Sequence, residues 1–153
     1  MSRLDTQPST LDPEPVKSPR TAEIIAGCQG QGLDPHYLGF FACFNQQLFY
    51  EAHEALEQLW LPARRTPEAA FYKGLIQMAG AFVHLQKGRI RPAAALFRLA
   101  KNNLQPYSPV QFHLNIGAVL RLIEDWHSQV TAPEFQVKLF ATLSPPKLQL
   151  SDK

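Results

Sequence analysis

The chain contains little cysteine and no long hydrophobic run. Only Cys28 and Cys43 occur among its 153 residues, and they form neither a Cys-x-x-Cys pair nor a disulfide framework. No stretch approaches the roughly 20 apolar residues that a membrane-spanning helix requires, and the N-terminal residues have no apolar core of signal-peptide length. We therefore expect neither a disulfide-stapled secreted domain nor a membrane partner, but a protein of the reducing cytoplasm.

The sequence also lacks the short motifs of several enzyme and binding classes. It has no glycine-rich phosphate loop, no Gly-x-Ser-x-Gly, no aspartate-rich calcium loop and no zinc-finger spacing. Charge of neither sign dominates, because 15 Lys and Arg against 13 Asp and Glu leave a formal net charge of +2. The basic residues between Lys87 and Lys101 have no aromatic residues interleaved on their exposed face. We interpret them as a solvated helix face and expect no nucleic-acid partner.

What the sequence does contain indicates an all-α protein of one domain. Hydrophobic residues make up 45% of the chain and charged residues 18%, as in globular proteins. Residues that start or end helices divide the apolar stretches. The starts are Asp34-Pro35, Thr66-Pro67 and Pro92, and the ends are Pro62 and Gly88. Because the connections are short, we predict a compact multihelical bundle with antiparallel neighbours.

The chain divides into three predicted regions. Residues 1–20 carry four prolines and scattered charges with nothing to bury, which predicts a disordered tail. Residues 21–131 form the predicted helical bundle. Residues 132–153 are expected to be a C-terminal extension that is extended or partly disordered.

Within the bundle, helix is expected throughout residues 40–104 apart from short turns. The turns are placed near Asn45, at 62–66 and at 88–91. Asn45 is expected to cap a helix that runs to Leu61, unless the helices on its two sides are continuous. A last helix is predicted over 115–127.

The most informative segment is the predicted helix over 49–60, which carries ionisable side chains within an apolar sequence. On a helical wheel, His53 and Glu57 lie one turn apart on a face that is otherwise apolar and aromatic. Ionisable groups are costly there unless they are paired or bound to a ligand. The next predicted helix carries a narrow polar stripe that includes Gln77 and His84. If this stripe faces the first helix, the four side chains meet.

One interpretation of this meeting point is a metal site. The sequence from His53 to Glu57 has the form His-Glu-x-x-Glu, which resembles the zinc-protease motif with glutamate in place of the second histidine. His53 and Glu57 would be two metal ligands and His84 a third, around a divalent metal such as zinc. Glu54 would act as the catalytic base on a metal-bound water.

Two other interpretations use the same residues without a metal. In one, Gln77 and His84 satisfy Glu57 and His53 in a buried hydrogen-bond network that fixes the register of the helices. In the other, the polar groups, Gln77 included, bind a small organic molecule, and Tyr50 and Trp60 form the walls of its pocket. The three alternatives remain open on the sequence alone.

Two blocks of residues resemble the signature of the domain of unknown function 309 family over about residues 40–104. The blocks are Phe44-Asn45, Tyr50 to Glu54, Leu56-Glu57 and Trp60, followed by Phe71, Gly74 to Gln77, Ala79, His84 and Gly88. Gln47 and Pro92 stand where the family pattern has glycine, which affects turns and not the site. The resemblance implies a small, soluble, multihelical protein with no established activity. A metal-dependent hydrolase role has been suggested for such proteins on the basis of their histidines.

Two classes of function therefore compete. The first is a metal- or small-ligand-binding site between two central helices, with hydrolysis as its catalytic form. The second is a non-catalytic interaction or scaffold protein, whose polar residues only fix helix packing. Self-association is compatible with both.

Overall fold

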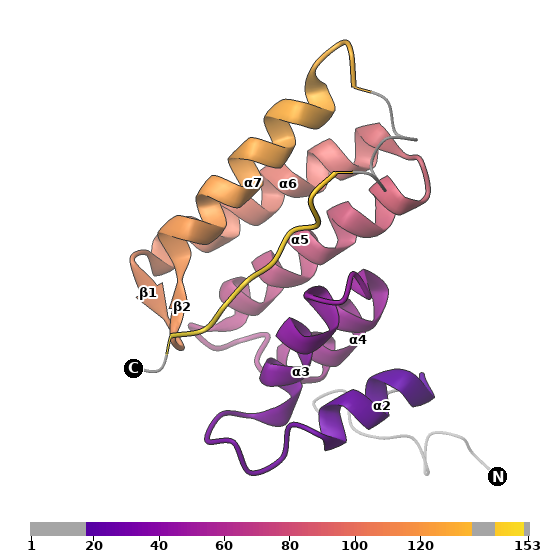
Figure 1. Ribbon diagram of the computed structural model, residues 1–153. Helices are drawn as coiled ribbons and strands as arrows, with labels where there is room; N and C mark the ends of the chain where they lie inside the picture. Colours follow the sequence, from indigo (N-terminus) through magenta and orange to yellow (C-terminus); the bar gives the residue numbers. More distant parts are fainter. Residues whose placement is uncertain (1–17, 136–142, 152–153) are drawn as a thin grey trace, which may run out of the picture.

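The computed structural model describes residues 18–135 and 143–151, and these residues form a mostly helical structure (Figure 1). The α-helices are α2 (Pro19–Ala26), α3 (Pro35–Phe44), α4 (Phe49–Trp60), α5 (Ala69–Gln86), α6 (Ile90–Leu104) and α7 (Ile116–Thr131). A 3-10 helix, η1 (Gln105–Tyr107), and a hairpin of β1 (Val110–Gln111) and β2 (Leu114–Asn115) connect α6 to α7. The predicted all-α fold class is confirmed.

Side-chain caps explain where three helices begin. Asp34 Oδ1 accepts a hydrogen bond from the His36 backbone N–H at 2.8 Å, and the proline that follows Asp34 suits the first turn of α3. Asn115 Oδ1 accepts from the Ala118 N–H at 2.9 Å and starts α7. Ser18 caps α2 in the same way. The starts predicted at Asp34-Pro35 and at residue 115 are therefore confirmed.

Other boundaries differ from the prediction. α2 begins at Pro19, so the last two residues of the predicted tail are helical, while residues 1–17 lie outside the described part of the chain. Asn45 ends α3 and does not cap α4. The Thr66 hydroxyl donates to the Ala63 carbonyl within the preceding loop, and α5 starts only at residue 69. α7 continues to Thr131, beyond the predicted end.

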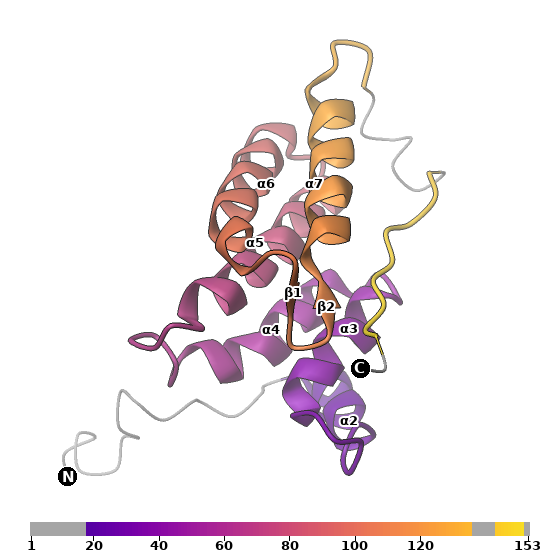
Figure 2. The ribbon, with the colours of Figure 1, turned by 90° about the vertical axis from the view of Figure 1, so that its left-hand side faces the viewer.

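The helices stack in chain order around α5. α5 contacts α4 on one side and α6 on the other, α3 pairs with α4, and α7 pairs with α6. α2 lies against both α3 and α4, at the end of the molecule far from α7 (Figure 1). Figure 2 shows α6 and α7 running side by side above the hairpin. The turns predicted near Asn45 and at 62–66 fall between these helices. The turn predicted at 88–91 is shorter than expected, because α6 already begins at Ile90.

Phe82 of α5 lies at the centre of the core. Its ring contacts aromatic rings from four other helices, at centroid distances of 5.0 to 5.6 Å. These rings are Phe44 of α3, Phe49 of α4, Phe97 of α6 and Trp126 of α7. Phe49 stacks on Phe82 and the other three meet it edge to face, which are the favoured geometries of aromatic pairs. One buried side chain thus connects five helices.

Small residues let α5 and α6 approach closely. A Cβ atom added at Gly74 would lie 2.7 Å from Leu104 Cγ, and one at Gly80 would lie 3.3 Å from Leu96 Cδ1. Both glycines therefore lie on the side of α5 that faces α6. None of the helices described between residues 18 and 135 combines the length and the hydropathy that a membrane-spanning segment needs.

The hairpin between η1 and α7 was not predicted. Its strands pair antiparallel, with Val110 opposite Asn115 and Gln111 opposite Leu114. The turn residues Phe112 and His113 have φ of 47° and 65°, in the left-handed region that residues other than glycine rarely adopt. The Tyr37 hydroxyl of α3 donates to the Phe112 carbonyl at 2.9 Å and helps hold this turn in place.

Candidate functional site

His53 and Glu57 form a pair on the solvent side of α4. His53 Nε2 and Glu57 Oε2 are 3.7 Å apart, and 29% and 40% of the two side chains are exposed. The ring of Tyr50, which is 56% exposed, packs on the His53 ring at a centroid distance of 5.4 Å. The predicted one-turn spacing is therefore present, but the pair lies at the edge of the core and not inside it.

Glu54 is the buried carboxylate of α4, with 9% of its surface exposed. Its Oε1 accepts a hydrogen bond from the hydroxyl of Thr21 at 2.9 Å, and its Oε2 accepts from the backbone N–H of Ser18 at 3.2 Å. Both donors belong to the start of α2. Glu54, which the metal interpretation uses as a catalytic base, thus ties α4 to α2.

Gln77 lies against α6 and not against α4. Its Oε1 accepts a hydrogen bond from Asn103 Nδ2 of α6 at 2.7 Å. At Gly74, about one turn before Gln77, an added Cβ would lie only 2.7 Å from Leu104 of α6. Because small residues on this side of α5 admit α6, the polar stripe that was expected to face His53 and Glu57 faces α6 instead.

His84 ends the polar stripe beside the turn between α5 and α6. The Arg89 N–H donates to the His84 carbonyl at 2.8 Å across this turn. The His84 Nδ1 atom is buried and has no hydrogen-bond partner among the described residues. Burial, followed by the nearby charges of Arg89 and Lys87, lowers the pKa of the His84 imidazole. A lowered pKa keeps this histidine neutral near pH 7.

The three predicted metal ligands are not brought together. Among the described residues, no group of three or more His, Cys, Asp or Glu side chains is placed to hold a metal ion. His53 and Glu57 remain a pair on α4, and His84 lies on the stripe of α5 that carries Gln77 toward α6. The expected meeting of all four side chains fails because α6, and not α4, occupies the side of α5 where the stripe lies.

The two aromatic walls of the predicted pocket lie at opposite ends of α4. Tyr50 and Trp60 are ten residues apart, which is about 15 Å along a helix axis. Trp60 is half-buried and lies under two cations, with Lys73 Nζ at 4.8 Å and Arg64 Cζ at 6.0 Å from its ring centroid. Trp60 therefore covers the connection between α4 and α5, and the two rings do not enclose one ligand.

Sequence reasoning missed the role of Asn45. Its side-chain amide donates to the Leu148 carbonyl at 2.8 Å, and its Oδ1 accepts from the Leu148 N–H at 2.8 Å. The only signal in the sequence was the position of Asn45 in the Phe44-Asn45 block of the family pattern. Asn45 was expected to cap a helix, and instead it holds the C-terminal segment.

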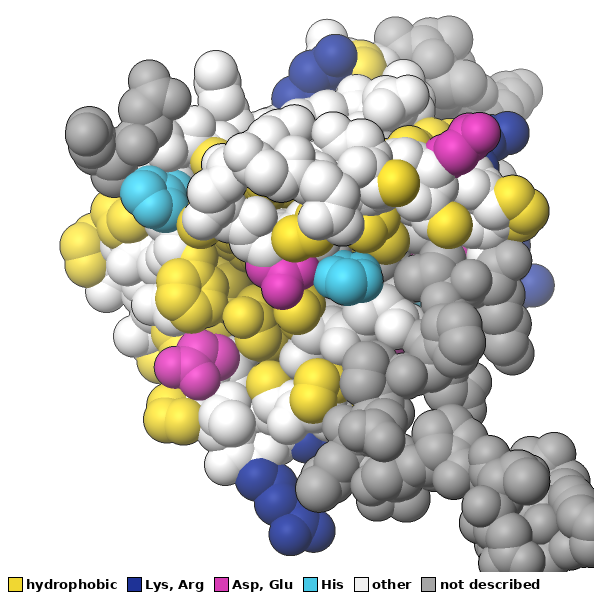
Figure 3. Space-filling model, turned by 90° about the horizontal axis from the view of Figure 1, so that it is seen from below, with side chains coloured by type: hydrophobic (Ala, Val, Ile, Leu, Met, Phe, Trp, Pro, Cys, Tyr) yellow, Lys and Arg dark blue, Asp and Glu magenta, His cyan; other side chains and the backbone are white. Residues whose placement is uncertain are grey.

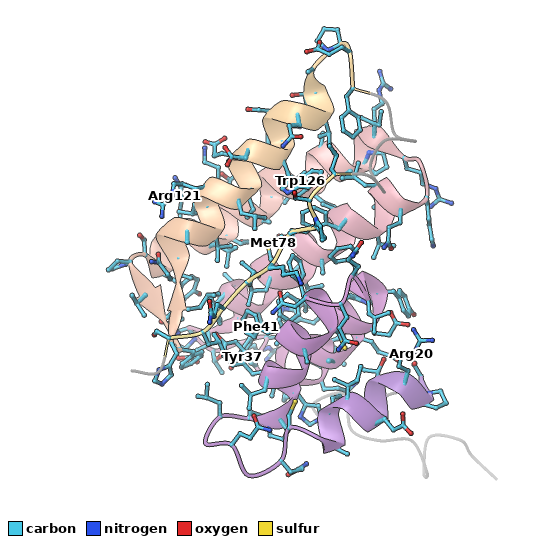
Figure 4. The ribbon with its side chains drawn as sticks, in the orientation of Figure 1. Arg20, Tyr37, Phe41, Met78, Arg121 and Trp126 are labelled. Carbon is cyan, nitrogen blue, oxygen red and sulfur yellow. The ribbon has the colours of Figure 1, made fainter. Side chains whose placement is uncertain are left out.

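A cavity of about 460 Å³ was also not anticipated. It opens between α7 and the C-terminal residues Leu143 and Ser144, and its lining includes Arg121, Asp125 and Trp126. Figure 4 shows Arg121 and Trp126 on α7, while Tyr37 and Phe41 come from α3 and Met78 from α5. The cavity therefore lies away from the polar residues of α4.

The described residues define an all-α domain whose polar side chains are divided among separate helix contacts. Residues 37–105 match the family described as Domain of unknown function (DUF309). The resemblance drawn from the sequence is thus confirmed over this segment, which runs from α3 to the end of α6. Searches of curated proteins and of solved structures found no match. The family description carries no activity that could be transferred.

Proposed function

We propose that this protein is a non-catalytic helical domain that acts by binding a macromolecular partner, and that the polar residues of its family signature stabilise helix packing. Glu54 carries the proposal. A general base must reach a proton of water or substrate, whereas Glu54 is buried and both of its oxygens accept hydrogen bonds from α2. Such a carboxylate supports a structural role.

The second polar contact supports the same role. Gln77 and Asn103 join α5 and α6, the two helices that share the most extensive contact in the described part of the chain, through one hydrogen bond of 2.7 Å. A partly buried amide that has lost its hydrogen-bond partner destabilises the folded protein. Such a bond therefore favours the helix register that keeps the two partners together. Glu54 thus stabilises the contact between α4 and α2, and Gln77 stabilises the contact between α5 and α6.

The surface offers apolar groups for a partner. Exposed hydrophobic side chains include Val110 and Phe112 of the hairpin, with 54% and 39% of their surfaces accessible. Figure 3 shows the molecule from below, where apolar side chains gather beside acidic side chains and histidines. Apolar surface bordered by polar groups is typical of protein interaction sites.

The competing function is a metal- or small-ligand-binding site on α4. The observation that favours it is the His53–Glu57 pair, whose i, i+4 spacing allows both side chains to reach one divalent ion such as zinc. Tyr50 beside His53 could contact a small ligand. A hydrolase would add His84 as a third ligand and Glu54 as the base, and both would have to leave their present surroundings.

Metal analysis of the purified protein separates the two functions. Zinc, manganese and iron are each offered to the full chain, excess metal is removed, and bound metal is counted by elemental analysis. We expect no stoichiometric metal in the wild type, in His53→Ala or in His84→Ala. One equivalent of metal in the wild type that is lost in His53→Ala would establish the competing function.

The stability of two glutamate variants completes this test. Glu54→Gln should lower the free energy of unfolding by about 1–3 kcal/mol, because a buried hydrogen-bonded group is disturbed. Glu57→Gln is the matched control on the same helix, and it should change stability by less than about 0.5 kcal/mol, because 40% of the Glu57 side chain is exposed and its charged neighbour, His53, is also partly exposed. Equal effects of the two substitutions would contradict the structural role of Glu54.

We also propose that the protein is located in the cytoplasm. Cys28 and Cys43 are both free thiols, which supports a reducing compartment. Reporter fusions that reveal the compartment would test this directly.

A further inference from the structure

The C-terminal residues 143–151 run antiparallel to α7 and end beside the hairpin (Figures 1 and 2). Leu143 and Ser144 line a cavity together with residues spread along α7, from Ala118 to Gln129. Leu150 pairs with Leu114, just before α7 begins. This segment, which we call the strap, is therefore seated along one face of the domain.

Asn45 holds the strap through its main chain alone. The amide donates to the Leu148 carbonyl and accepts from the Leu148 N–H, both at 2.8 Å. One primary amide thus satisfies both backbone groups of a single residue, as a neighbouring strand would. Because no side-chain atom of the strap takes part, this contact recognises any extended peptide backbone.

β2 continues this recognition along the strap. β2 pairs with β1, and its residue Leu114 also forms an antiparallel bridge with Leu150 of the strap. The Ser151 N–H donates to the His113 carbonyl at 2.8 Å. The addition of an extended segment to a sheet edge is a general mode of peptide recognition.

The side chains of the strap alternate between the domain and solvent. Pro146 and Leu148 are buried and Leu150 is half-buried, while Lys147 and Gln149 between them are exposed. This period of two is that of an extended strand. The surface therefore selects a segment of the pattern Pro-x-Leu-x-Leu and leaves the intervening positions unspecified.

The receptor and its occupant come from different parts of the chain. Asn45 lies inside the family segment 37–105, whereas β2, α7 and the strap lie beyond its end. We propose that Asn45, β2 and the adjoining surface of α7 form a docking groove for an extended Pro-x-Leu-x-Leu segment of a partner protein. In this chain the strap is an intramolecular occupant, and the partner segment must displace it.

The docking groove specifies a partner class for the interaction role proposed above and rests on that role. Displacement has a quantitative consequence, because a tethered occupant competes at an effective concentration in the millimolar range. A free peptide should therefore bind weakly to the wild-type chain. It should bind much more tightly once the strap has been loosened.

The test uses the full chain and a fluorescein-labelled peptide with the sequence of residues 143–153. Leu148→Asp places a charge on a buried strap position and leaves the docking groove untouched. Gln149→Asp places the same charge on an exposed strap position and is the matched control. Fluorescence anisotropy measures peptide binding, and circular dichroism and thermal melting verify the fold of each variant.

We expect the Leu148→Asp chain to bind the peptide at least about tenfold more tightly than the wild type and the Gln149→Asp chain. Adding Asn45→Ala to Leu148→Asp should abolish this gain, and a peptide that itself carries Leu148→Asp should not bind. A folded Leu148→Asp chain without improved binding would overturn the proposal. So would binding that is independent of Asn45.

Two further outcomes would overturn the docking groove. Loss of cooperative melting in Leu148→Asp would show that the strap is an integral part of the core. An Asn45-dependent dimer of the wild type would identify the strap of a second copy as the occupant. Neither outcome changes the metal content or the effect of Glu54→Gln on stability, so a failure of the docking groove is distinguishable from a failure of the structural role of Glu54.

Discussion

Replacement of Gly74 by alanine tests the close approach of α5 and α6. The added Cβ would lie 2.7 Å from Leu104 Cγ, 2.9 Å from Leu104 Cδ2 and 3.2 Å from Asn103 Cβ. Leu104 is fully buried, and Asn103 Cβ is attached directly to the α6 backbone. A change of side-chain rotamer alone cannot make room, so the two helices must separate, and the Gln77–Asn103 hydrogen bond is disturbed as they do.

Gly80→Ala is the matched control on the same helix. Its Cβ would meet only Leu96 Cδ1, at 3.3 Å, which is the far end of a flexible and half-buried side chain. Both substitutions replace a helical glycine, so both gain about 1 kcal/mol of helix propensity. The difference between the two variants therefore isolates the cost of overpacking at Gly74, which is about 1–3 kcal/mol.

Urea denaturation followed by circular dichroism measures this difference. Gly80→Ala should be as stable as the wild type or more stable, and Gly74→Ala should be less stable than Gly80→Ala by the overpacking cost. In a thermal melt this corresponds to a gap of roughly 2–4 °C for each kcal/mol in a chain of this length. A Gly74→Ala protein as stable as Gly80→Ala would refute the close contact, and with it the assignment of the polar stripe to α6.

Three further predictions concern titration, a surface aromatic and the thiols. Because the pKa of His84 is lowered in the folded state, the unfolded chain binds more protons as the pH falls below about 6.5. The urea concentration at the unfolding midpoint should therefore decrease as the pH is lowered from 7.5 to 5.5, and His84→Gln should make this decrease smaller. The same pH dependence in His84→Gln and the wild type would contradict the assignment. Trp60→Ala should cost less than the roughly 3–5 kcal/mol of a fully buried aromatic, and Lys73→Ala about 0.5–1 kcal/mol through its cation–π contact, both measured by denaturation midpoints. Burial raises the pKa of the Cys43 thiol to about 12, so in a Cys28→Ser background a thiol reagent should modify Cys43 only on unfolding, and rapid modification of the native protein would refute its burial.

Local sequence signals predicted the helices well. Asp34-Pro35 and Asn115 begin helices because their side chains cap the first turn within a few residues of themselves. The hairpin was missed because its strands are two residues long and its left-handed turn is made by Phe112 and His113. These residues carry none of the glycine or asparagine signals that mark such turns.

The candidate site was less predictable because it depends on which helices are neighbours. Helical spacing correctly placed His53 one turn from Glu57. The pattern of the polar stripe does not reveal which helix the stripe faces, and α6 took the place that was assigned to α4. The contact of Asn45 with Leu148 spans 103 positions in the sequence, so no local pattern could reveal it.

The most direct test of the account is a double-mutant cycle on Thr21 and Glu54. The single variants Thr21→Val and Glu54→Gln and the double variant are compared with the wild type by urea denaturation at pH 7. If Glu54 stabilises the packing of α2 on α4 through the Thr21 hydroxyl, the two effects should couple by about 1 kcal/mol or more. Effects that add to within about 0.5 kcal/mol, with wild-type stability in Glu54→Gln, would show that Glu54 is not a structural carboxylate.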